Sequence, residues 1–167
     1  MSFEQLDPSL IKTHRGKSYV GISTGVAIFN QKGQLFLAKR SLNARDEHGT
    51  WDGCGGGLEW GLTLEENMRQ EMLEEFNIIT DSPLHFLRLK EAFRTDQKGH
   101  KTHWLSIGYI VILNDDEVTQ VKINEPDKFD EMDWFSLDNL PTPLHSLITS
   151  ELIGMLKDTY NKVTATN

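Results

Sequence analysis

Apolar residues recur in this chain with two different periods, one typical of helices and one typical of strands. Within residues 64–76 an apolar side chain stands at every fourth position, which predicts a helix with one buried stripe. These positions are Leu64, Met68, Met72 and Phe76. We therefore expect one face of this helix to pack against the rest of the chain.

Both ends of this helix are marked by residues that favour helix termini. Thr63, with Glu66 three residues later, forms a capping box and predicts the first turn. Asn77 predicts the last turn, because Asn tolerates the left-handed backbone conformation that often ends a helix.

Four other runs are rich in β-branched and aromatic residues and are predicted to be strands. They are residues 19–29, 34–39, 84–93 and 102–113. The first two are separated by a short polar turn and should form a hairpin. The last run is almost continuously apolar, which predicts a central strand of the sheet.

A second long helix is predicted to open at Pro143, because Pro suits the first helical turn and apolar residues follow with helical spacing. We read residues 1–17 as a loose lead-in, 18–160 as a single domain and 161–167 as a frayed tail. The order of strands, helix, strands and helix predicts an α/β fold with a mixed sheet between helices.

Composition narrows the classes of function. The chain has 167 residues and a net charge of −8, which argues against a nucleic-acid polymer as partner. A single cysteine excludes an internal disulfide and fits a reducing compartment. No apolar run has the length of a membrane span and no signal peptide is recognisable, so we expect a cytoplasmic protein without a membrane partner.

Three glutamates crowd one side of the predicted helix 64–76. Glu71, Glu74 and Glu75 share a helix side next to the apolar stripe, and no Lys or Arg stands three or four residues away. Like charges repel there, and the negative end of the helix dipole adds to the repulsion. A divalent cation would relieve both effects, and carboxylate oxygens suit Mg²⁺ or Mn²⁺.

The three glutamates also have a simpler explanation, in which they form an acidic helix face that is exposed to water. Glutamates are good helix formers, and most acidic faces are exposed to water. The placement beside the apolar stripe argues for the metal, as does the dense run of glycines from Gly53 to Gly57, where backbone can approach a ligand closely. A glycine cluster by itself would indicate a turn.

The glycines and glutamates of this segment also follow a fixed spacing, which opens at Gly56. The matching positions further along are Glu71, Met72, Glu74, Glu75 and Ile78. With these residues the segment resembles the Nudix box, in which a glycine, a glutamate, an Arg-Glu pair and a Glu-Glu pair precede a second glycine. The chain is thereby identified as similar to the MutT-like members of the Nudix hydrolase superfamily.

Three positions depart from the box. Leu62 replaces its first glutamate, Gln70 its arginine and Asn77 its second glycine. Asn77 suits the same left-handed cap. Gln70 removes a guanidinium that in the family helps to hold the glutamates. Leu62 and Gln70 together motivate an alternative, a catalytically weak Nudix-like domain that binds a nucleotide or a protein.

The resemblance implies an α/β/α sandwich and a Mg²⁺-dependent pyrophosphohydrolase. Its substrate would be a nucleoside diphosphate linked to another group, with nucleoside triphosphates and nucleotide sugars as the first expectations. Glu71, Glu74, Glu75 and Gly56 would hold the metal, and Glu74 could also act as the base. Relatives are often dimers, so a homodimer is possible.

Other candidate residues lie outside the box. Glu131, with Glu125 as runner-up, is the expected extra glutamate that completes the metal site or acts as base, although either could be a solvated loop acid. Arg40 and His103 are candidate substrate contacts, and each could equally be an ordinary surface residue. Trp51 is expected first to pack and second to stack on a base or sugar.

A third reading is an isoprenoid diphosphate isomerase on the same fold. Such enzymes need a reactive cysteine, and Cys54 is the sole candidate. The residues around it do not match that group.

Overall fold

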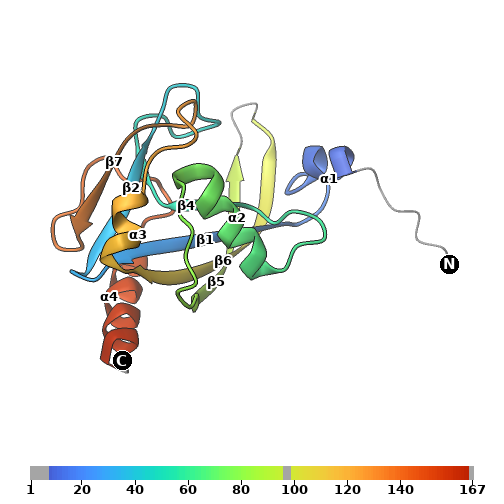
Figure 1. The fold of residues 1–167 in the computed structure, drawn as a ribbon. Helices are drawn as coiled ribbons and strands as arrows, with labels where there is room; N and C mark the ends of the chain where they lie inside the picture. The colour runs from blue at the N-terminus through green and yellow to red at the C-terminus, as the bar shows by residue number, and fades with distance from the viewer. Residues whose placement is uncertain (1–7, 96–98, 166–167) are drawn as a thin grey trace.

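The computed structural model describes residues 8–95 and 99–165 (Figure 1). In chain order its elements are α1 (Pro8–His14), β1 (Gly21–Asn30), β2 (Gln34–Arg40), β3 (Trp51–Asp52), β4 (Cys54–Gly57), α2 (Leu64–Phe76), β5 (His85–Thr95), β6 (Lys101–Leu113), α3 (Asp115–Gln120), β7 (Phe129–Ser136) and α4 (Ser150–Ala165). None of the described helices is both long and apolar enough to cross a membrane.

The strands form one mixed sheet around β1. Its main path runs β3-β2-β1-β6-β5, with β4 paired to β1 and β7 paired to β2. β1 and β6 are parallel, whereas β1 with β2 and β5 with β6 are antiparallel. The predicted hairpin and the predicted central strand are both confirmed, since β6 lies between β1 and β5.

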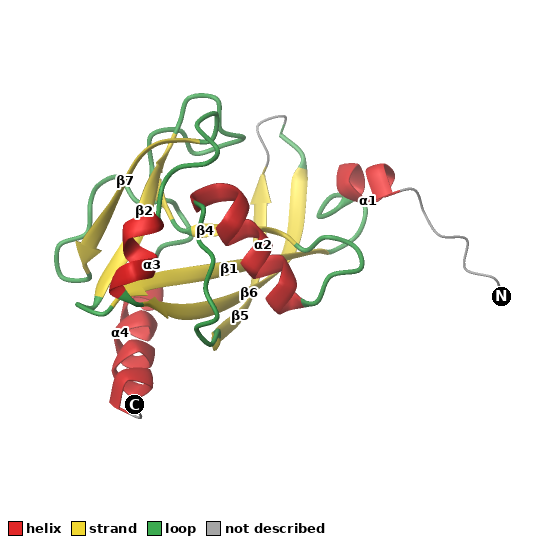
Figure 2. Ribbon diagram, viewed as in Figure 1, coloured by secondary structure: helices red, strands yellow, loops and turns green. Residues whose placement is uncertain are grey.

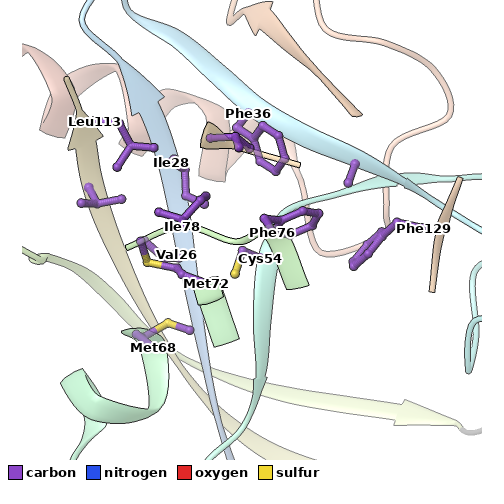
Figure 3. Close-up of a cluster of buried hydrophobic side chains, with 13 residues drawn as sticks. Val26, Ile28, Phe36, Cys54, Met68, Met72, Phe76, Ile78, Leu113 and Phe129 are labelled. Carbon is purple, nitrogen blue, oxygen red and sulfur yellow. The ribbon is translucent and has the colours of Figure 1, made fainter. Parts of the chain in front are cut away.

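Alternate side chains of β1 enter two different cores, which makes the molecule a three-layer sandwich. Val26 and Ile28 belong to the core beneath α2, together with Met68 and Met72 of that helix (Figure 3). Phe29 belongs to the core on the other face, where α4 packs. Figure 2 shows α2 lying across one face of the sheet, and the predicted α/β/α architecture is confirmed.

The helix α2 forms as its sequence predicts. Thr63 and Glu66 make the reciprocal hydrogen bonds of a capping box, and Asn77 ends the helix in the left-handed conformation at φ 56°. Met68, Met72 and Phe76 of the predicted stripe are buried as expected, whereas Leu64 at its start is only half-buried.

Several expectations about the ends of the chain were wrong. The lead-in contains a helix, α1, although residues 1–7 lie outside the described residues. Pro143 does not open α4: the carbonyl of Pro143 accepts a hydrogen bond from Trp51 N, and His145 N donates to Trp51 O, so this segment runs alongside Trp51. The helix starts at Ser150 instead.

The C-terminal segment was also misjudged. α4 continues to Ala165, where the sequence predicted fraying from 161 onward, and residues 166–167 lie outside the described part. α3 and β7 were not predicted. The strand β7 is acidic on its exposed side, and that acidity masked its alternation.

Candidate active site

Strand β4 brings the glycine loop directly against α2. Its residues pair with β1 in antiparallel register, so alternate glycines face opposite sides of the sheet. Gly56 faces α2, and a Cβ added there would collide with the carboxylate of Glu71. The glycine is therefore required by the close approach of that side chain.

Glu75 is the most deeply buried carboxylate of the site, with 1% of its surface exposed. One oxygen accepts a hydrogen bond from Gly55 N at 3.2 Å, and the other forms an ion pair with Nζ of Lys128. The thiol of Cys54 is a further hydrogen-bond partner. Burial raises the pKa of Glu75, while Lys128 acts to lower it.

Glu71 is half-buried beside Glu75 and is the group most affected by its surroundings. Loss of hydration, followed by the charge of Glu75, raises the pKa of Glu71 to about 7. Glu74, by contrast, is exposed and accepts a hydrogen bond from Gln70 Nε2 at 2.8 Å. The predicted trio is thus two inward carboxylates and one outward one.

The loop before β7 supplies the counter-charge. Asn124 ties this loop to the end of α2, with its backbone N donating to Glu75 O at 2.9 Å and its Nδ2 donating to Leu73 O at 3.0 Å. The loop thereby holds Lys128 against Glu75 and leaves Glu125 3.7 Å from the same ammonium. Glu125 also raises the pKa of Glu71, so its charge is felt inside the cluster.

The cluster has the chemistry of a divalent cation site. Its donors are carboxylate oxygens, which divalent cations such as Mg²⁺ prefer. The side chains of Glu71 and Glu75 are both withdrawn from water, and this loss of hydration, together with the charge of Glu75, raises the pKa of Glu71. Among the residues that the structure describes, no three acidic, histidine or cysteine side chains already converge on one point. The ammonium of Lys128 lies among the carboxylates and supplies the positive charge in this arrangement.

Glu131 does not join this cluster. Its neighbour Met132 packs against the core beneath α2, and strand alternation points Glu131 to the other face of the sheet. There it pairs with Lys39 at 2.8 Å and keeps 57% of its side chain exposed. The runner-up from the sequence, Glu125, is the acid that the structure brings to the glutamates.

The three substrate-contact candidates occupy different environments. Arg40 is buried and paired with Asp46 at 2.7 Å and Asp52 at 3.1 Å, so it is not an ordinary surface residue. Trp51 packs edge-on against Phe135.

His103 lies at the start of β6, away from α2. It stacks on Phe93 and lies 2.7 Å from a carboxylate oxygen of Glu91. Neither His103 nor Trp51 is among the described residues that line the main cleft.

That cleft, of about 1160 Å³, opens beside the glycine loop, and its lining includes Leu35, Leu37 and Leu156 of the core on which α4 packs. Gly53 to Gly57, Glu125 and Lys128 all line it, which connects it to the glutamate cluster. Eight lining residues are Lys or Arg, and the acidic ones are Asp46, Asp52, Glu125 and Asp127. A cleft with excess positive charge in a protein of net charge −8 is suited to an anionic ligand.

Sequence reasoning missed two residues that shape the site. Lys128 stands 53 residues from Glu75, so no helical spacing could reveal the pair. Arg15 follows α1, and its guanidinium lies over Gly57 and donates to Leu58 O. Only the crowding of glycines hinted that some side chain must pass over the loop.

Comparison with known proteins agrees with this geometry. Residues 20–153 match the model of the NUDIX domain family. The chain is 30% identical over 127 residues to an RNA pyrophosphohydrolase of Pseudoalteromonas translucida, covering 68% of this chain and 69% of that protein. It is also 30% identical over 115 residues to an oxidized purine nucleoside triphosphate hydrolase of Danio rerio, covering 66% and 64% respectively.

A solved structure of a protein from the same family has a similar fold. A MutT NUDIX hydrolase from Burkholderia pseudomallei superposes with a TM-score of 0.65 and 26% identity, covering 83% of this chain and 97% of that one.

Proposed function

Because the chain belongs to the NUDIX domain family and is a Nudix-type pyrophosphohydrolase, we propose that it cleaves a diphosphate bond of a nucleotide with the help of Mg²⁺ or Mn²⁺. The substrate would be a nucleoside diphosphate linked to another group, with nucleoside triphosphates first. We place the reaction in the cytoplasm, which the presence of a single cysteine supports.

One observation carries this proposal: a buried and a half-buried carboxylate side by side behind a glycine loop, at the edge of a basic cleft. The charge of Glu75 adds to the loss of hydration that raises the pKa of Glu71, and a divalent cation would favour the charged form of both carboxylates. The phosphates of a nucleotide in the cleft would meet them at the free edge of β4, where Glu125 and Lys128 line the cleft.

Different residues of the chain would bind the cation and the phosphates. Glu71, Glu75 and the outward Glu74 would hold the cation, with Gly56 allowing Glu71 to approach the loop. A bound divalent cation neutralises phosphate oxygens and lowers the pKa of water. Lys128 would supply a further positive charge to the phosphates, since it already lies at the edge of the cleft.

The general base would come from the same edge. Glu125 is solvent-accessible, lies close to Lys128 and faces the cleft. Glu74 is exposed on the outer side of α2 and is the second choice. We propose Glu125 in place of Glu131, which points to the opposite side of its strand.

The products formed from a panel of substrates, a nucleoside monophosphate together with pyrophosphate or a second phosphorylated group, test the proposal. The panel contains nucleoside triphosphates, nucleotide sugars and dinucleoside polyphosphates, each assayed with Mg²⁺ and again with EDTA. We expect one class to be cleaved with Mg²⁺ and to be inert with EDTA. Cleavage that continues at the same rate in EDTA, or no cleavage of any diphosphate, would contradict it.

The second candidate is a domain that binds a nucleotide without cleaving it. Lys128 favours this reading, because its ammonium already balances Glu75. Leu62 and Gln70 favour it too. Tight nucleotide binding with no cleavage product from any member of the panel would select this candidate.

A further inference from the structure

A row of residues without side chains leads from the glycine loop across the sheet. Gly55 of β4 pairs with Gly25 of β1, Gly25 pairs with Gly108 of β6, and Gly108 pairs with Arg88 of β5. At about 4.8 Å per strand, the Cα atoms of Gly55 and Arg88 are roughly 14 Å apart. All four residues line the cleft of about 1160 Å³.

Arg88 extends its side chain along this row. Its Cγ lies 3.4 Å from the position that a Cβ on Gly108 would take, so the first part of the side chain lies over Gly108 of β6. Burial lowers the pKa of Arg88, and the charge of Glu151 on α4 acts to raise it. Among the described residues, none forms a hydrogen bond or a close ion pair with its guanidinium.

Other arginines of the cleft are already engaged. Arg40 is held by Asp46 and Asp52, and Arg94 is held by Asp46 and Glu47 at 2.7 Å. Half-burying a charged guanidinium that has no close carboxylate partner costs free energy, unless a ligand supplies the negative charge. The planar set of donors of a guanidinium matches the oxygens of a phosphate.

We propose that Arg88 is a specificity-determining residue. It binds a phosphate group that the nucleoside carries in addition to its 5′ diphosphate, at the end of the cleft away from the glutamate cluster. This inference rests on the proposed function, in which the diphosphate is cut at the glutamate cluster. The nucleoside would lie over Gly25 and Gly108, and a phosphate on its ribose 2′ or 3′ oxygen would reach Arg88. A nucleoside triphosphate alone carries no such group.

Two kinds of substrate carry such a phosphate on the ribose. A 3′-phosphorylated nucleotide carries it as a monoester, and the first nucleotide of a 5′-triphosphorylated oligonucleotide carries it as a diester. Steady-state kinetics compare adenosine triphosphate, its 3′-phosphorylated form and a 5′-triphosphorylated dinucleotide. Arg88→Met keeps the aliphatic contact with Gly108. It should raise KM about tenfold for the substrates with a second phosphate, with kcat and the KM for adenosine triphosphate unchanged.

Two controls accompany this variant. Arg88→Lys should recover part of the affinity. Lys90→Met removes a charge two residues further along β5 at a position that does not line the cleft, and it should leave the KM values of all three substrates unchanged. An equal rise in KM for all three substrates, or no rise for any, overturns the role of Arg88. A rise for the dinucleotide alone assigns the diester, and a rise for the 3′-monoester alone assigns the monoester.

Binding without turnover separates this inference from the proposed function. Calorimetry on the wild-type chain should show adenosine 3′,5′-bisphosphate binding about tenfold more tightly than adenosine 5′-monophosphate, and Arg88→Met should abolish that difference. If the difference is found while no substrate is cleaved, the proposed function fails and the role of Arg88 stands. If cleavage is normal and the wild-type chain shows no difference, the role of Arg88 is overturned.

Discussion

Glu75 and Lys128 form an ion pair whose partners are buried to different degrees. The glutamate side chain is 1% exposed and the lysine side chain 31% exposed. The cost of withdrawing the carboxylate from water is offset by Lys128, Gly55 and Cys54 together. The family's box arginine is absent at Gln70, and Lys128 provides a cation from a different element.

Lys128→Met should destabilise the metal-free protein by about 3 kcal/mol, because it leaves a buried carboxylate without its counter-charge. Added Mn²⁺ should restore part of the loss by binding the same carboxylate. Urea unfolding with and without Mn²⁺ measures both effects. Lys39→Met is the matched control, since its pair with Glu131 is largely exposed and should cost less than about 1 kcal/mol. Equal losses in the two variants would refute the assignment.

Glu71 predicts an unusual pH dependence for the metal-free protein. The native pKa of Glu71 is about 7, against 4.5 for an ordinary glutamate, so the native state keeps a proton that the unfolded state has lost. Stability should therefore fall as pH rises from about 4.5 to 7, and the contribution from this group should be flat outside that window.

The melting temperature across that range checks this expectation. Glu71→Gln cannot titrate and should show a shallower fall than the wild-type chain. Saturating Mg²⁺ should also flatten the wild-type curve, because a cation favours the charged carboxylate. Parallel curves for the wild-type chain and Glu71→Gln would show that Glu71 titrates normally.

At the level of elements, the site depends on how closely β4 and α2 approach one another. Cys54 faces the core beneath α2, and Gly56 on the same face leaves room for Glu71. The capping box fixes where α2 begins, and Asn124 fixes its other end to the loop that carries Lys128. The carboxylates are thus positioned by three separate segments of the chain.

Gly56→Ala should weaken Mn²⁺ binding about tenfold, because its Cβ would displace the Glu71 carboxylate from the loop. Electron paramagnetic resonance of free Mn²⁺ measures the affinity directly. Gly154→Ala is the control: nothing lies within 4 Å of that position on α4. It should leave the affinity unchanged and raise stability by about 1 kcal/mol, the usual gain for replacing a helical glycine. An unchanged affinity in Gly56→Ala would remove the steric argument.

For the molecule as a whole, local signals predicted the fold well. The capping box, the four-residue apolar period and the apolar run of β6 each depend on neighbours in sequence, and each was confirmed. The start of α4 was misplaced because Pro143 is held by a partner, Trp51, that lies far away in sequence. Strand β7 escaped prediction because its exposed acids hide its buried face.

In the candidate site, too, the residues predicted correctly depend on local sequence, and the residues missed depend on distant segments. Glu71 and Glu75 were placed beside the core by helical geometry, and both lie there. Lys128, Arg15 and Arg88 reach the site or the cleft from distant segments, and only the sheet register and the loop contacts bring them together. The charge of −8 gave no hint that the cleft itself is basic, because net charge does not report its distribution.

The central claim is that buried carboxylates on α2 bind the cation on which hydrolysis depends. The most direct measurement is the Mg²⁺-dependent rate of diphosphate cleavage in Glu75→Gln and in Glu65→Gln, an exposed glutamate of the same helix that pairs with Arg69. We expect Glu75→Gln to lose about a hundredfold or more in rate and Glu65→Gln to match the wild-type chain. A near-normal rate in folded Glu75→Gln would contradict the claim.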